Sequence, residues 1–79
     1  MNNNLNDIID TVNKINIYSY FINNEQIEKF NTVKKYFNGN IGYNKIELHN
    51  NLLDLCTIMH CLALNGTKNK IVEYINKEL

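Results

Sequence analysis

Apolar residues recur every three or four positions through most of the chain, and clusters of Asn and Gly interrupt the pattern. The first apolar segment begins after Asn4, which we predict to be an N-cap. Its apolar side chains share one stripe of a helix and are Leu5, Ile8, Ile9, Val12 and Ile15. The spacing predicts a helix from Leu5 to about Asn16.

Residues 15–22 continue this segment with β-branched and aromatic side chains, which also suit a strand. No comparable second strand follows, so we extend the helix through this stretch. An extended helix places Ile17 and Phe21 opposite the core stripe, with Tyr18 on the flank. In the alternative, the helix stops near Asn16 and the following residues bend back under the domain. Both interpretations stay open at this point.

A second helix is predicted to start at Asn23, because Gln26 stands where the partner of a capping box belongs. We expect it to end at Asn38-Gly39, where Gly accepts a left-handed backbone. The third helix, roughly Asn44 to Leu64, becomes apolar nearly all round from its middle, which indicates a helix surrounded by others.

A fourth helix completes the chain. We expect Asn65 and Gly66 to close the third helix and Thr67 to cap the fourth. Such a short connection makes these two helices antiparallel. The sequence therefore predicts a single all-α domain over residues 1–79, a small four-helix or three-plus-one bundle with a central, apolar third helix.

The composition of the chain disfavours several classes of function. Eight basic and eight acidic side chains cancel, and 44% of the 79 residues are hydrophobic. A neutral chain without arginine does not favour nucleic-acid binding, which depends on neutralising phosphates. We expect no membrane segment, since the longest apolar run is too short and polar residues interrupt it. The N-terminus lacks the pattern of a secretion signal, so we expect a cytoplasmic protein.

Candidate chemistry gathers on the third helix. His49, Cys56 and His60 share a face, but His49 is too far along the axis to bind the same ion as the other two. We therefore expect no metal site and no other cofactor. Cys56 and His60 are the one pair on this helix whose spacing suits a shared ion. Cys56 and Cys61 are too far apart on one helix for a disulfide. Without converging nucleophile, base and orienting groups, we do not expect an enzyme.

The functional hypothesis is a small non-enzymatic protein-binding module. The composition is typical of an AT-rich genome. Together with the small size, it associates the chain with phage or mobile-element inhibitors of the anti-defence, immunity or antitoxin type. Such an inhibitor acts in the host cytoplasm by steric occlusion of its partner. We assign partner binding to Ile17, Tyr18, Phe21 and Tyr36, since aromatic residues are enriched at interface hot spots. Homodimer formation is compatible with this assignment. The alternatives are a small DNA-binding transcriptional regulator and a homo-oligomeric structural protein.

Overall fold

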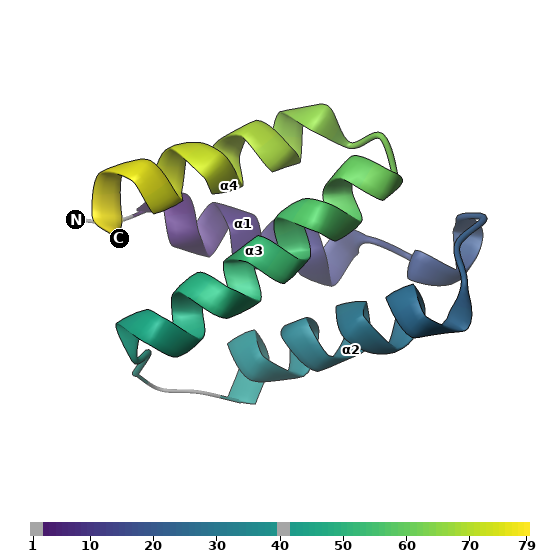
Figure 1. The fold of residues 1–79 in the computed structure, drawn as a ribbon, viewed down its shortest axis with the longest axis horizontal. Helices are drawn as coiled ribbons and strands as arrows, with labels where there is room; N and C mark the ends of the chain where they lie inside the picture. Colours follow the sequence, from purple (N-terminus) through teal and green to yellow (C-terminus); the bar gives the residue numbers. More distant parts are fainter. Residues whose placement is uncertain (1–2, 40–41) are drawn as a thin grey trace.

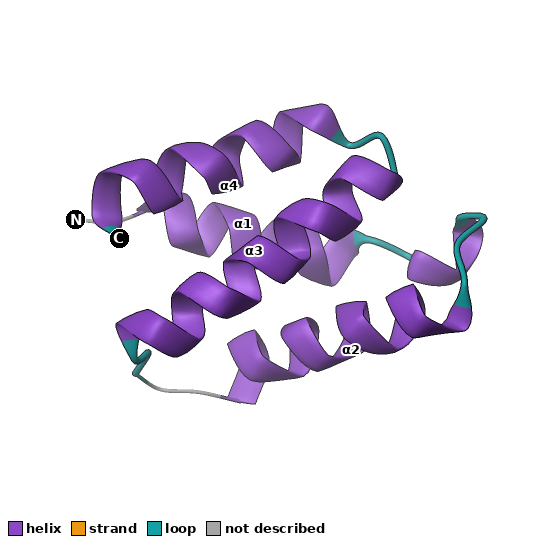
Figure 2. Cartoon of the chain, in the orientation of Figure 1, coloured by secondary structure: helices purple, strands orange, loops and turns teal. Residues whose placement is uncertain are grey.

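The computed structural model describes residues 3–39 and 42–79, which form four α-helices and one short 3₁₀ helix (Figure 1). These elements are α1 (Asn3–Lys14), η1 (Ile17–Ser19), α2 (Asn24–Gly39), α3 (Lys45–Cys61) and α4 (Asn65–Glu78). Within the described residues there is no strand (Figure 2). The predicted all-α, four-helix architecture is confirmed.

The helices alternate in direction along the bundle. In Figure 1, α3 lies between α2 and α4, and α1 passes behind it. The start of α1 and the end of α4 lie at the same end of the molecule. The radius of gyration is 11.8 Å, close to the ~12 Å expected of a folded chain this long. Short connections between antiparallel neighbours produce this arrangement.

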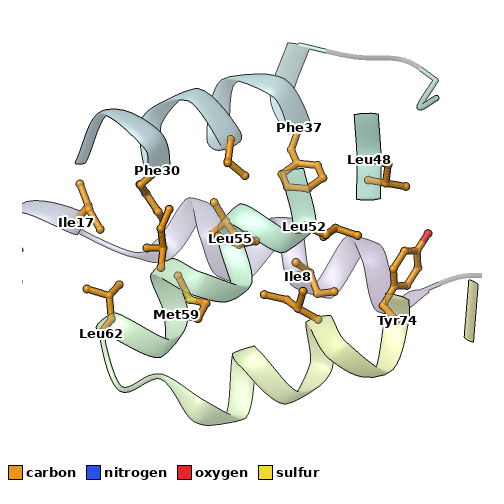
Figure 3. Packing of buried hydrophobic residues seen from close by; sticks show 14 residues of the cluster. Ile8, Ile17, Phe30, Phe37, Leu48, Leu52, Leu55, Met59, Leu62 and Tyr74 are labelled. Carbon is orange, nitrogen blue, oxygen red and sulfur yellow. The ribbon is translucent and has the colours of Figure 1, made fainter. Parts of the chain in front are cut away.

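The core draws on every helix, and α3 supplies the largest share (Figure 3). The core residues are Ile8, Val12, Ile17, Phe30, Val33, Phe37, Leu48, Leu52, Leu55, Ile58, Met59, Leu62, Ile71 and Tyr74. No charged side chain is buried within the described part of the chain. Burial of apolar surface is therefore the main force that holds the helices together.

The first helix is shorter than predicted. It ends at Lys14, so the extension through residue 22 is wrong, and it already includes Asn4, which is not its N-cap. The side chain of Asn16 accepts a hydrogen bond from the backbone N–H of Tyr18 at 3.3 Å, which starts η1. Asparagine favours such local bonds over a continued helix. The chain bends back, and Ile17 enters the core at 3% exposure.

Two helix starts agree with the sequence prediction. Asn23 Oδ1 accepts from the N–H of Gln26 at 2.8 Å, and Gln26 Oε1 accepts from the N–H of Asn23 at 3.3 Å, which completes the capping box. At α3, Asn44 Oδ1 accepts from the N–H groups of Ile46 and Glu47 at 2.8 and 3.2 Å. Each cap satisfies backbone donors that the first helical turn leaves free.

The connection between α3 and α4 is short, as predicted, but lies earlier in the chain. α3 ends at Cys61 and α4 already begins at Asn65, so Thr67 is not its cap. The left-handed residue is Ala63, with φ of 60°, while no described glycine has a positive φ. The second helix ends at Gly39 as predicted, but Gly39 does not adopt the left-handed backbone expected there. Asn65 and Gly66, expected to close the third helix, instead lie in the first turn of α4.

Candidate functional site

Exposed hydrophobic side chains gather in two places on the described surface. Tyr18 and Phe21, on η1 and the segment after it, are 71% and 108% exposed. The other exposed large hydrophobic residues lie on α3, on α4 or at the residue that follows α4, and they are Ile46, Leu53, Val72 and Leu79. Scattered single exposures are normal, but a set of this kind on two packed helices marks a candidate interaction surface.

The α3 members of this set share one side of the helix. With 100° per residue, Ile46, His49, Leu53 and His60 fall within about 60° of one another. This side lies away from the core stripe that contains Leu52. It therefore forms an outward ridge along the length of α3.

The neighbouring flank of α4 completes the surface. Lys68, Val72 and Leu79 recur at helical spacing and lie on one flank of α4. Lys68 borders a hollow with Leu53 and His60 of α3, and Leu79 borders another with Ile46. Because both ends of this flank meet α3, the intervening Val72 lies on the same surface. We call the surface formed by the following residues the α3–α4 face: Ile46, His49, Leu53, His60, Lys68, Val72 and Leu79.

Two open hollows lie on the α3–α4 face. The larger, about 520 Å³, is lined by Leu53, Cys56, Thr57, His60 and Lys68. The smaller, about 260 Å³, is lined by Lys45, Ile46, His49 and Leu79. Both combine apolar walls with basic or imidazole groups at the edge. Such hollows can accept apolar side chains of a partner, as hot-spot pockets do.

The side chains that line the two hollows are basic or neutral. No acidic side chain lines either hollow, whereas a lysine borders each of them. Lys68 Nζ lies 3.2 Å from His60 Nδ1, a contact in which the ammonium donates to the ring nitrogen. The contact holds a cation over the larger hollow. An ion pair on α4 joins Glu73 to Lys77 at 2.9 Å, and both side chains are exposed.

The four residues predicted from sequence to bind a partner do not form one surface. Ile17 is buried in the core, so its predicted place on an exposed patch is wrong. Tyr18 and Phe21 are exposed, and Tyr18 Oη accepts a long hydrogen bond of 3.4 Å from Asn31 on α2. Tyr36 lies further along α2, near its C-terminal end. Only two of the four are therefore both exposed and near each other in the chain.

Tyr36 belongs to an aromatic cluster. Its ring centroid is 5.5 Å from those of Phe37 and Tyr43, and Tyr43 Oη donates to the backbone carbonyl of Phe37 at 2.8 Å. Burial raises the pKa of Tyr36 above its ordinary value, and the charge of Glu47 and the neighbouring Tyr43 add to the rise. The cluster joins the end of α2 to the start of α3, which gives Tyr36 a structural role.

The side chains on α3 that are able to bind a metal ion do not gather into a site within the described residues. Within residues 3–39 and 42–79, no three His, Cys, Asp or Glu side chains lie close enough to share a metal ion. Cys56 and Cys61 are free thiols, the first half-buried and the second exposed. Cys61 Sγ lies 3.2 Å from Gln26 Nε2 on α2. Cys56 and His60 instead border the larger hollow together.

The sequence pattern does not distinguish the α3–α4 face from a buried surface, because apolar residues nearly all round a helix also indicate burial. The third helix is apolar nearly all round, which predicts that other helices surround it. In the structure α2 and α4 flank it, while Leu53 remains 44% exposed and Ile46 73% exposed. The excess apolar residues at helical spacing, outside the core stripe, were the signal.

Comparison with known proteins found no matching family model, no matching curated protein and no matching solved structure. None of the described helices has the length and apolar character required to cross a bilayer. The class of protein that the structure defines is thus a small all-α four-helix domain. Its function has to be argued from the α3–α4 face itself.

Proposed function

We propose that this chain is a non-enzymatic protein-binding module and that it contacts its partner through the α3–α4 face. The observation that carries the proposal is the exposure of Ile46, Leu53, Val72 and Leu79, together with two hollows that α3 shares with Lys68 and with Leu79. A few apolar anchors that fill pockets supply most of the binding energy at protein interfaces.

The mechanism that fits this surface is steric. A rigid bundle that covers a working surface of its partner inhibits that partner without performing any reaction. We therefore propose an inhibitor of the phage or mobile-element type, with anti-defence, immunity and antitoxin roles as the particular forms. It would act in the cytoplasm of the host cell. Size and composition support this association, and the exposed apolar face supports the binding step.

Site-specific photo-crosslinking tests the proposal. A photoreactive phenylalanine analogue replaces Leu53 on the α3–α4 face in one variant and Lys70 in another. Lys70 is exposed and follows Lys68 by two residues, so it lies on nearly the opposite side of α4. Both variants are expressed in the native host and irradiated. The crosslinked products are then separated by mass.

The expected result is a discrete heteromeric adduct from position 53 and none from position 70. An adduct of twice the 9.3 kDa chain mass would assign the face to a homodimer. Equal labelling from both positions, or no adduct from position 53, would contradict the proposal.

A further inference from the structure

We infer that the partner presents an acidic amphipathic helix, which lies along the α3–α4 face with its apolar stripe toward Leu53. This inference rests on the proposed function and names the chemistry of the partner. Three properties of the face carry it: its charge, its length and the spacing of its two hollows.

The charge of the face selects an acidic partner. Lys45 borders the smaller hollow and Lys68 the larger, so a lysine stands at each end. The face also includes His49 and His60, and no acidic side chain lines the hollows. Complementary charges at the rim of an interface steer association and select among partners. Glutamate or aspartate beside the apolar stripe of a partner would meet these lysines.

The dimensions of the face suit a helix. Ile46 and His60 are 14 positions apart, which corresponds to about 21 Å along α3, or roughly four helical turns. The α3 residues around the two hollows centre about 15 Å apart along the same axis, between two and three turns. A helix with apolar side chains separated by two to three turns can place one anchor in each hollow. Apolar anchors at helical spacing are the means by which amphipathic helices are recognised.

A second copy of the chain fits the face less well. In a twofold dimer the same surface meets itself, so each lysine-bearing face would oppose another of like charge. Like charges across an interface disfavour that pairing. The charge pattern therefore favours a different, acidic chain as the occupant.

Three designed peptides of about 16 residues, four and a half turns, serve as probes. The first carries a leucine stripe flanked by glutamates, and the second carries the same stripe flanked by lysines. The third has the composition of the first but its leucines are spread around the helix. Binding of each fluorescent peptide to the full-length chain is measured by anisotropy at low and at high salt.

The variants form a matched set. Lys68→Glu reverses a charge on the face, and Lys70→Glu makes the same change two residues away on the opposite side of α4. Glutamate in the first turn of α4 suits the positive end of the helix, so the Lys68 variant keeps its fold. Leu53→Asp removes the apolar contact at an exposed position. Circular dichroism verifies that all three variants fold.

We expect the glutamate-flanked peptide to bind about tenfold more tightly than the lysine-flanked peptide, and the scrambled peptide not to bind. Lys68→Glu should weaken binding of the first peptide about tenfold, equivalent to about 1.4 kcal/mol, and Leu53→Asp should abolish it. Lys70→Glu should change the affinity for the first peptide by no more than about threefold. Salt should reduce the preference for the acidic peptide.

Equal binding of the acidic and basic peptides, or equal effects of the two lysine variants, would overturn the inference. Sedimentation of the free chain as a dimer that Leu53→Asp dissociates would assign the face to a second copy and would also overturn it. These outcomes differ from failure of the proposed function. If the peptides fail while crosslinking at position 53 traps a protein, the face binds a partner of another chemistry.

Discussion

Ala63 occupies the backbone position where a helix terminus favours glycine. Its φ is 60°, and its side chain is exposed. The N–H of Ala63 donates to the carbonyl of His60 at 3.1 Å, and the N–H of Leu64 donates to that of Met59 at 2.9 Å. These bonds form a Schellman motif with alanine in the left-handed position. We predict that Ala63→Gly stabilises the protein.

The magnitude follows from two opposing effects. A left-handed backbone costs an L-residue roughly 1–2 kcal/mol, a cost that glycine does not bear. Glycine also widens the unfolded ensemble, which removes about 0.4–1 kcal/mol of stability. Because the Ala63 methyl is exposed, its loss leaves no cavity. The net gain is about 0.5–1 kcal/mol, which raises Tm by about 2–8 °C in a domain this small.

Gly66→Ala provides the companion experiment. Gly66 lies in the first turn of α4, its φ is not positive, and a Cβ there meets nothing within 4 Å. Alanine should therefore raise stability by up to about 1 kcal/mol through its helix propensity and the smaller unfolded ensemble. Opposite substitutions at Ala63 and Gly66 should thus both stabilise the protein.

Urea unfolding followed by circular dichroism, together with calorimetric Tm, measures both variants. If the left-handed residue were Gly66 rather than Ala63, Gly66→Ala would lower the free energy of unfolding and Ala63→Gly would not raise it. That pair of signs would refute the assigned connection. Ala63→Val offers a third check, since a β-branched side chain at positive φ should destabilise the protein.

The remaining predictions concern the core, a helix cap and alkaline pH. Ile17→Ala should lower the free energy of unfolding by about 2–5 kcal/mol, and Phe21→Ala by less than about 0.5 kcal/mol. Equal losses in urea melts would contradict the burial of Ile17. Asn44→Ala should cost about 1 kcal/mol by removing a cap, whereas Asn50→Ala, inside α3, should not destabilise it. Burial raises the pKa of Tyr36, so its contribution to stability is full below the unfolded pKa of about 10 and is lost as pH rises further. Chemical denaturation across alkaline pH should show this loss, and Tyr36→Phe should reduce it; an unchanged pH profile would argue against the assignment.

Local signals in the chain predicted much of the fold. The spacing of Ile8 and Val12 indicated the core face of α1, and both are buried. Asn23 with Gln26 marked the start of α2, and Asn44 marked that of α3. These features were readable because helix periodicity and capping depend on residues within a few positions of one another.

The path of the chain after α1 depended on contacts distant in sequence. The segment containing Ile17 suited a helix, a strand or a bend on local grounds alone. The buried position of Ile17 among residues of other helices accompanies the bend, and the same bend leaves Phe21 fully exposed. A prediction that counted both residues as one outward patch therefore failed for the first and located only the second on the surface.

By itself, the sequence determined that this chain forms four amphipathic helices in one all-α bundle, and where two of them begin. Only the tertiary structure decided which apolar residues remain outside the core. The α3–α4 face combines Leu53 with Val72, which come from different helices. The reason is physical: periodicity defines the stripes of each helix, but exposure depends on which stripes the neighbouring helices cover.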